Sequence, residues 1–334
     1  MDPGKNAGIK LGIFALVTVA FVAILLFYAD ARQEGWGSGF KSGITNVEAF
    51  ADVLNGQQLV EKSFTVQPGG EFVLDTDVGD VAIEGSEGEE VSVSVEVRGD
   101  SDDLRKFDVQ FRQSDNRVEV RGTWKKRGWR FWDWNGIDAR FSIKVPRQFS
   151  ANVSTAGGDI RLGAVDGVAK LVTSGGDVRV QEVQGETSVE TSGGDIIVRQ
   201  VVGTVHLETS GGDITVSDVQ GDTRAETSGG DIRIAAPDGR IDAETSGGDI
   251  EVHARGETRG MYLDTSGGDI VIYVPRDIRA TVDASTTGGE VVCELEIATR
   301  GKIEDNELHG KINGGGERIQ AETLGGDIYI RALR

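Results

Sequence analysis

The sequence predicts an all-β protein, a parallel β-solenoid (β-helix) of about ten 18-residue rungs preceded by one transmembrane α-helix. A Thr-x-Gly-Gly-Asp string recurs at intervals of 18 residues, and apolar and polar residues alternate on both sides of each copy. A long run without charge lies near the amino terminus. The first two observations predict the solenoid, and the third predicts the helix.

The repeat is regular over more than one hundred residues. Eighteen residues are too few for an independent domain, so we expect each copy to form one rung of a stack. Later copies begin at Thr265, Thr286 and Thr323 with less regular spacing. The copies spaced by 18 residues begin at Thr155, Thr173, Thr191, Thr209, Thr227 and Thr245.

Each rung is predicted to hold two short strands. β-branched residues alternate with polar ones after the acid, as at Ile196 and Val198, and an apolar residue such as Leu207 lies two positions before each Thr. Rungs stacked at the strand spacing of about 4.8 Å would pair each strand with its copies above and below. The Gly-Gly pair between the strands suits a tight turn where a Cβ would clash with the next rung.

The chain is predicted to divide into six segments. Terminal rungs of a solenoid must cover an open core, so the less regular ends are interpreted as caps. The segments are a cytoplasmic amino terminus (1–10), the transmembrane helix (11–29), a linker (30–58), an N-terminal cap with irregular first rungs (59–150), the regular repeats (151–271), and C-terminal rungs with a cap (272–334). Within the N-terminal cap, strands are expected at 63–66, 71–75, 80–84, 91–97, 117–122 and 140–145.

The uncharged run from Leu11 to Ala29 is long enough to span a bilayer. Lys5 and Lys10 precede it, which favours a cytoplasmic amino terminus. We therefore expect a single-pass protein of the inner or plasma membrane, with the bulk of the chain in the periplasm or on the cell surface. A cleaved signal peptide is the alternative, because residues 29–31 read Ala-Asp-Ala, but cleavable apolar cores are usually shorter.

Composition excludes several classes of protein. The net charge of −20 argues against nucleic acid as a partner, since phosphate binding needs clustered Lys and Arg. The single cysteine, Cys293, excludes a disulfide framework and is expected to be buried and inert. His206, His253 and His309 fall in different rungs without the spacing of a metal site or a catalytic triad. We therefore expect no enzyme activity, no cofactor and no metal.

The acid of each repeat forms a predicted ladder along the stack. Each carboxylate is expected to accept hydrogen bonds from turn N–H groups while Arg161, Arg179 and Arg233 screen the charge. The Thr hydroxyls of the repeat are expected to point inward and to satisfy one another. Ca²⁺ between rungs is the alternative that we do not favour, because calcium β-rolls carry Gly-Gly-x-Gly-x-Asp twice in each coil, whereas Gly-Gly-Asp occurs once in each repeat of this chain. The ladder is Asp159, Asp177, Asp195, Asp213, Asp231, Asp249 and Asp269.

A cluster of tryptophan and basic residues interrupts the acidic chain. Trp with cations suits lipid head groups, sugar rings or a protein hot spot. The other interpretation is a hairpin loop whose aromatic side chains cover the end of the solenoid core, and the sequence favours neither. The candidate partner-binding or membrane-binding residues are Trp124, Lys125, Lys126, Arg127, Trp129, Arg130, Trp132 and Trp134.

These features together resemble the bacterial family known as putative adhesins, a domain of unknown function. The resemblance rests on the membrane segment, Val-Pro-Arg at 145–147, the repeated Thr-Ser-Gly-Gly-Asp-Ile, and the closing glycine-rich stretches at 313–317 and 325–328. It covers roughly residues 60–333 and implies surface adhesion without catalytic residues.

The expected function is a membrane-anchored extracytoplasmic module for non-catalytic adhesion or scaffolding in the bacterial cell envelope. Its partner would be an envelope protein or a glycan. Some proteins similar to this family are linked to cell-envelope stress responses, so a regulatory partner in such a response is one alternative. A solenoid carbohydrate-active enzyme is the other.

Overall fold

The computed structural model describes residues 57–124, 136–235, 237–255, 259–299 and 305–333. All of them belong to one compact unit, Thr45–Arg334. The predicted cytoplasmic terminus and transmembrane helix (11–29) lie outside these residues, as does nearly all of the linker. Among the described residues, no helix is both long enough and apolar enough to cross a membrane.

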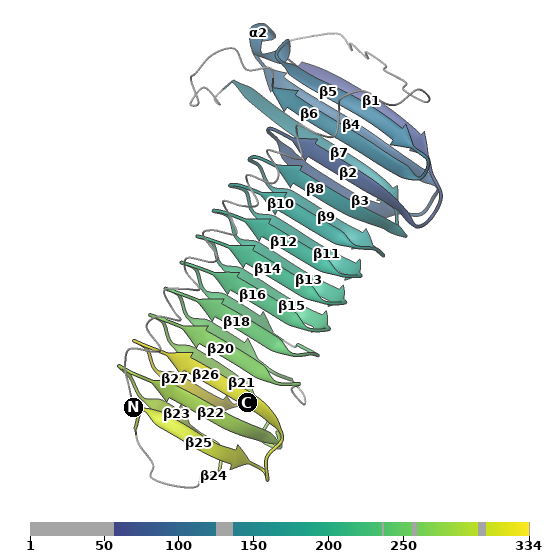
Figure 1. Ribbon diagram of the computed structural model, residues 1–334. Coiled ribbons are helices and arrows are strands. Elements are labelled where there is room, and N and C mark those ends of the chain that lie inside the picture. The colour runs from purple at the N-terminus through teal and green to yellow at the C-terminus, as the bar shows by residue number, and fades with distance from the viewer. Residues whose placement is uncertain (1–56, 125–135, 236, 256–258, 300–304, 334) are drawn as a thin grey trace. The chain divides into compact units, whose positions relative to one another are not determined.

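Two sheets make up this unit, one of 13 strands (sheet A) and one of 14 strands (sheet B). Each regular rung contributes one strand to sheet A and one strand to sheet B. Figure 1 shows these rungs stacked in sequence order from β8 to β21. The sheet B and sheet A strands of these rungs are β8 (Phe149–Thr155) and β9 (Ile160–Val165), β10 (Ala169–Thr173) and β11 (Val178–Gln184), β12 (Thr187–Thr191) and β13 (Ile196–Val202), β14 (Val205–Thr209) and β15 (Ile214–Gln220), β16 (Thr223–Thr227) and β17 (Ile232–Ala235), β18 (Ile241–Thr245) and β19 (Ile250–His253), and β20 (Met261–Thr265) and β21 (Ile270–Val274).

Neighbouring rungs pair in parallel with equivalent residues opposite one another. Val178 lies opposite Ile196 in sheet A, and Leu171 lies opposite Val189 in sheet B. Paired residues are separated in sequence by one repeat, so the equivalent positions of successive rungs form columns across the sheets. Every rung therefore buries the same columns. The predicted parallel β-solenoid is confirmed.

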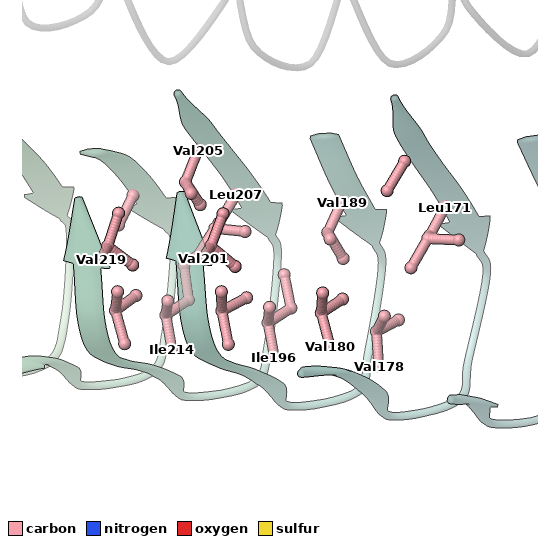
Figure 2. Packing of buried hydrophobic residues seen from close by; sticks show 14 of the residues in the cluster. Leu171, Val178, Val180, Val189, Ile196, Val201, Val205, Leu207, Ile214 and Val219 are labelled. Carbon is pink, nitrogen blue, oxygen red and sulfur yellow. The ribbon is translucent and has the colours of Figure 1, made fainter. Parts of the chain in front are cut away.

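Apolar columns from the two sheets meet between them to form the core. Figure 2 shows Ile196 and Val201 of sheet A facing Val205 and Leu207 of sheet B, and all four are fully buried. Burying one such side chain stabilises the fold by about 1.5–3 kcal/mol. A single rung leaves both of its open sides uncovered, so this burial depends on the rungs above and below.

A bulge repeats in sheet A and was not predicted. Inward positions 178 and 180 are followed by 183 instead of 182, which breaks the period of two. Glu182 and Gln200 are the extra residues of their strands, and each has φ near +55°. The strand pairing runs from Gln181 opposite Arg199 directly to Val183 opposite Val201. The bulge therefore brings a third apolar side chain of each such strand into the core.

The N-terminal cap mixes parallel and antiparallel pairing. β2 and β3 stack directly on β8 and β9, β6 and β7 lie beyond them, and β1, β4 and β5 pair antiparallel. The six expected strands are present, although β1 begins six residues earlier than expected, and β5 and a short helix were missed. The elements are β1 (Gln57–Thr65), β2 (Gly70–Thr76), β3 (Asp80–Ser86), β4 (Glu90–Gly99), α2 (Ser101–Leu104), β5 (Phe107–Ser114), β6 (Arg117–Trp124) and β7 (Ile137–Pro146).

The C-terminal rungs do not stack in sequence order. β26 and β27 lie between β20 and β21 on one side and β22 and β23 on the other, so the last rung of the chain is inserted inside the stack (Figure 1). β25 pairs antiparallel with β22 and with β24. The elements are β22 (Ala280–Thr286), β23 (Val291–Cys293), β24 (Ile297–Thr299), β25 (Glu307–Ile312), β26 (Glu317–Thr323) and β27 (Ile328–Ala332).

Cys293 is only partly buried, contrary to expectation. It belongs to β23, an edge strand of three residues with a neighbour on one side only. Its Sγ lies 3.6 Å from the Leu295 carbonyl oxygen, and burial raises the pKa of the thiol. The inward column that it occupies is incompletely covered because, in the described part of the chain, sheet A ends at β23.

Candidate functional site

The predicted acid ladder binds each turn to the previous one. The backbone N–H of Asp177 donates to Asp159 Oδ1 at 3.1 Å, and the N–H of Asp195 donates to Asp177 Oδ1 at 3.0 Å. The same bond recurs along the ladder to Asp269, whose N–H donates to Asp249 Oδ1 at 2.8 Å. One carboxylate oxygen in each rung therefore accepts a backbone hydrogen bond from the following rung.

Arginines hold the other carboxylate oxygen in three of the rungs. Arg161 Nη2 lies 3.0 Å from Asp159 Oδ2, Arg179 Nη2 lies 3.0 Å from Asp177 Oδ2, and Arg233 Nη2 lies 2.8 Å from Asp231 Oδ2. Among the residues that the structure describes, no group of three or more His, Cys, Asp or Glu side chains could hold a metal ion. The chain itself thus supplies partners for both oxygens of these three carboxylates.

The Thr side chains of the repeat are buried, but their hydroxyls do not satisfy one another. Thr209 Oγ1 donates to the Gly194 carbonyl oxygen of the preceding rung at 3.0 Å and accepts from the Gly212 N–H at 3.4 Å. Strand spacing of about 4.8 Å is too long for a hydrogen bond between stacked hydroxyls. That part of the prediction is wrong, because the backbone of the preceding turn lies closer.

Trp124 is the one member of the tryptophan cluster within the described residues. It ends β6, is half-buried and packs against the core, and its backbone N–H donates to Asp77 Oδ2 at 2.9 Å. Lys106 Nζ lies 5.9 Å from the centre of its ring. Trp124 therefore helps to cover the core. Lys125, Lys126, Arg127, Trp129, Arg130, Trp132 and Trp134 lie outside the described residues.

A hollow of about 1010 Å³ opens on the outer face of sheet A, where the antiparallel strands meet the parallel stack. We call it the sheet-A hollow, and it extends over β1, β4, β7, β3, β9, β11 and β13. Small residues lie across its middle, namely Ser94, Ser142, Ala82 and Gly163. The hollow was not predicted, although Ser92 and Ser94 at outer positions of β4 were a signal for it.

Charged side chains surround this small-residue floor. Four basic side chains on the outer face of sheet A line the hollow against three acidic ones, whereas the whole chain has a net charge of −20. The hollow is therefore a local exception to the acidity of the protein. The basic residues are Lys144, Arg161, Arg179 and Arg199, and the acidic residues are Glu61, Glu84 and Glu182. Lys62 also borders the hollow, but it lies opposite the buried Val93, on the inner side of the sheet.

Sheet B carries a second row of carboxylates on its outer face. Glu208 lies opposite Glu190 and Glu226 in the parallel register, and the row continues through Glu244. Burial raises the pKa of Glu208, and the charges of Glu190 and Glu226 raise it further. Burial likewise raises the pKa of Glu190 and of Glu244.

We expect Glu208→Gln to stabilise the protein at pH 7. Folding raises the pKa of this carboxyl above its ordinary value of 4.5, so its protonated form favours the folded state. That contribution is fully present below pH 4.5 and is lost as the pH rises through the pKa of the folded state. The ionised Glu208 therefore opposes folding at neutral pH. Thermal unfolding at pH 7 should shift upward by about 1–3 °C, and the difference from wild type should shrink toward pH 4.

Glu186→Gln is the matched control, because Glu186 is exposed in the corner between β11 and β12, outside the row. It should leave the transition at pH 7 nearly unchanged. If both variants shift it equally, net charge and not the stacking of carboxylates sets the effect.

The stacked sheets, the repeated turn and the inserted final rung define this unit as a parallel β-solenoid closed at both ends by antiparallel strands. The family model Toastrack DUF4097 matches residues 70–331, from β2 to β27. The chain belongs to this family. No curated protein matches it.

Several solved structures are similar over most of their length. One is described as a putative adhesin from Bacteroides fragilis, with 14% identity and a TM-score of 0.40, covering 82% of this chain and 97% of that chain. Another, described as a putative adhesin from Parabacteroides distasonis, has 14% identity and a TM-score of 0.36, covering 81% and 96%. A third, from the same species and described as a putative lipid binding protein, has 12% identity and a TM-score of 0.37, covering 83% and 97%.

Proposed function

We propose that the protein is a membrane-anchored, extracytoplasmic β-solenoid that acts as a non-catalytic adhesion or scaffolding module of the bacterial cell envelope. The observation that carries this proposal is the sheet-A hollow, a broad open surface on the outside of a sheet instead of an enclosed cleft. Its polar side chains come from seven neighbouring strands and are spread over the surface. Such a surface suits binding of an extended partner.

The stack beneath the hollow supports the same proposal. Parallel strand pairing, the acid ladder and the buried Thr hydroxyls each bind a rung to its neighbour, as at Asp195 and Thr209. A support bonded in this way loses little conformational freedom when a partner binds, so more of the interaction energy appears as affinity. Rigidity of this kind is what a display module requires.

Anchoring is proposed from residues 11–29, which precede the solenoid in the chain. The chain reaches the described unit at β1, and β1 itself lines the hollow through Glu61 and Ser63. A membrane tether would therefore join the solenoid at the strand that borders the proposed binding surface.

Labelling of single cysteines tests the proposed location in intact cells. In a Cys293→Ser background, Glu186→Cys should react with a membrane-impermeant maleimide added outside the cytoplasmic membrane, and Lys5→Cys should react only after that membrane is permeabilised. Labelling of both sites before permeabilisation, or of neither, would overturn the anchored topology.

Attachment of cells tests the proposed activity separately. Deletion of the protein should reduce attachment to host or abiotic surfaces, and the full chain should restore it. Normal attachment together with an altered response to wall-active agents would contradict adhesion and would support a regulatory role.

A further inference from the structure

The outer face of sheet A arranges the residues of the hollow in two rows that cross the strands. Strand pairing places Ser94 opposite Ser142, Ser142 opposite Ala82, Ala82 opposite Arg161, and Arg161 opposite Arg179. At about 4.8 Å for each strand, this row is roughly 19 Å long. That length suits an oligomer lying across the strands better than a single small molecule. The second row holds Ser92, Lys144, Glu84, Gly163, Gln181 and Arg199.

The floor of the hollow offers hydroxyl groups and little steric bulk. The Ser94 and Ser142 hydroxyls have no hydrogen-bond partner among the described residues, and the small side chain of Ala82, opposite Ser142, leaves room for a ligand to approach the sheet. A hydroxyl both donates and accepts hydrogen bonds. The floor can therefore bind a ligand that is itself rich in hydroxyl groups.

The basic side chains of the hollow can bind negative charge at several places along it. Arg161 contacts Asp159 and Arg179 contacts both Asp177 and Asp159, and the two arginine side chains remain 52% and 42% exposed. Lys144 and Arg199 have no carboxylate within 4.0 Å in the described part of the chain. An arginine binds a carboxylate through two parallel hydrogen bonds, which makes carboxylate a suitable anionic group.

The lining argues against a nucleic acid. It contains no aromatic side chain on which bases could stack. Glu61, Glu84 and Glu182 stand among the basic residues, where they can accept hydrogen bonds from sugar hydroxyls. The whole chain has a net charge of −20, so the protein as a whole repels anions and an acidic ligand is favoured in this hollow.

We propose that the sheet-A hollow binds a linear acidic polysaccharide, with its carboxylates on Arg161, Arg179, Arg199 and Lys144 and its hydroxyls on the serines of the floor. This inference rests on the proposed function, since it names the envelope or surface component that the module binds. It assigns specificity to the spacing of carboxylates along the sugar chain.

The test uses the full chain in a non-ionic detergent and oligogalacturonate of about ten sugars as the probe, with binding measured by calorimetry. We expect binding that weakens as salt is added. The fully methyl-esterified oligosaccharide, which has the same backbone without the charge, should bind at least tenfold more weakly. Replacing Arg161 and Arg179 together with Gln should also weaken binding of the acid at least tenfold.

Arg233→Gln is the matched control, because Arg233 lies on the same outer face, contacts its own Asp231 in the same way, and does not line the hollow. It should bind the acid as wild type does. Ser142→Tyr provides a second variant that fills the floor without removing charge, and it should also weaken binding. Ser142 is exposed, so the core beneath it is not altered.

Three results would overturn the proposal. They are equal binding of the acid and its methyl ester, equal losses from Arg233→Gln and from the double variant, and binding only to vesicles of anionic phospholipid. If the oligosaccharide fails to bind while deletion still abolishes attachment, the adhesive function stands and the assignment of ligand class is wrong. If the oligosaccharide binds while attachment is normal in the deletion strain, the hollow is a glycan site and the adhesive function is wrong.

Discussion

Gly212→Ala should destabilise the solenoid by about 3 kcal/mol. A Cβ at Gly212 would lie 2.1 Å from the Gly194 carbonyl oxygen and 2.4 Å from its carbonyl carbon, in the turn of the preceding rung. Those atoms are backbone, held by the hydrogen bond from Thr209 and by strand pairing on both sides. Relief of the clash therefore requires two rungs to separate, and a shift of one side chain cannot supply it.

Gly211→Ala is the control for this prediction. It alters the other glycine of the same pair, where the nearest atom to an added Cβ lies 3.8 Å away. Its effect should be within about 1 kcal/mol of zero, because Ala also lowers the entropy of the unfolded chain. Denaturant unfolding of the full chain measures both variants, and equal losses would show that turn conformation and not the contact between rungs selects glycine.

The two glycines of the repeat thus have different roles, although the sequence pattern treats them alike. The second one meets the backbone of the preceding rung at about the same distance in each regular turn, and the first one is open to solvent or in ordinary contact. The expectation that a Cβ would clash holds for the second glycine only. Those closely packed glycines are Gly176, Gly194, Gly212, Gly230, Gly248, Gly268 and Gly326.

Prediction of the regular rungs succeeded because one period controls both burial and pairing. Residues 18 apart, such as Ile196 and Ile214, lie in the same column and opposite each other in the sheet. The last rung breaks this relation, because Thr323 lies opposite Thr265 across 58 residues of sequence. No local pattern distinguishes insertion between two rungs from addition at the end, since both bury the same columns.

The candidate site was harder to predict than the fold. The acid ladder follows directly from the repeat, whereas the sheet-A hollow depends on contacts between strands that are distant in sequence. β7 lies between β4 and β3, so Ser142 meets Ser94 and Ala82 only after the N-terminal cap has formed. A row made from three such strands leaves no period in the sequence.

The buried threonines provide a second pair of contrasting variants. Thr209→Val should destabilise the protein by about 1–3 kcal/mol, because it removes a donor to the Gly194 carbonyl and an acceptor for the Gly212 N–H while both backbone groups stay in the turn. The side chain keeps its size and shape, so loss of packing contributes little. A midpoint of denaturant unfolding below that of wild type is the expected result.

Thr223→Val should have the opposite sign. Thr223 is 2% exposed, and its Oγ1 has no hydrogen-bond partner among the described residues. Its neighbours in the column are Val205 and Ile241, so a Val completes an apolar column and removes a buried hydroxyl that lacks a partner. We expect stabilisation by up to about 1 kcal/mol.

Comparison of the two variants separates hydrogen bonding from side-chain identity, because the same substitution is made at two buried positions of one strand pair. Equal destabilisation would mean that both hydroxyls have partners in solution, and equal stabilisation would mean that the bond from Thr209 to the preceding turn contributes nothing. Opposite signs would establish that the Thr of the repeat is selected for its bond to the Gly194 carbonyl. The Thr, the closely packed Gly and the Asp of each turn would then each make a separate bond or contact with the same preceding rung, which explains why they recur together.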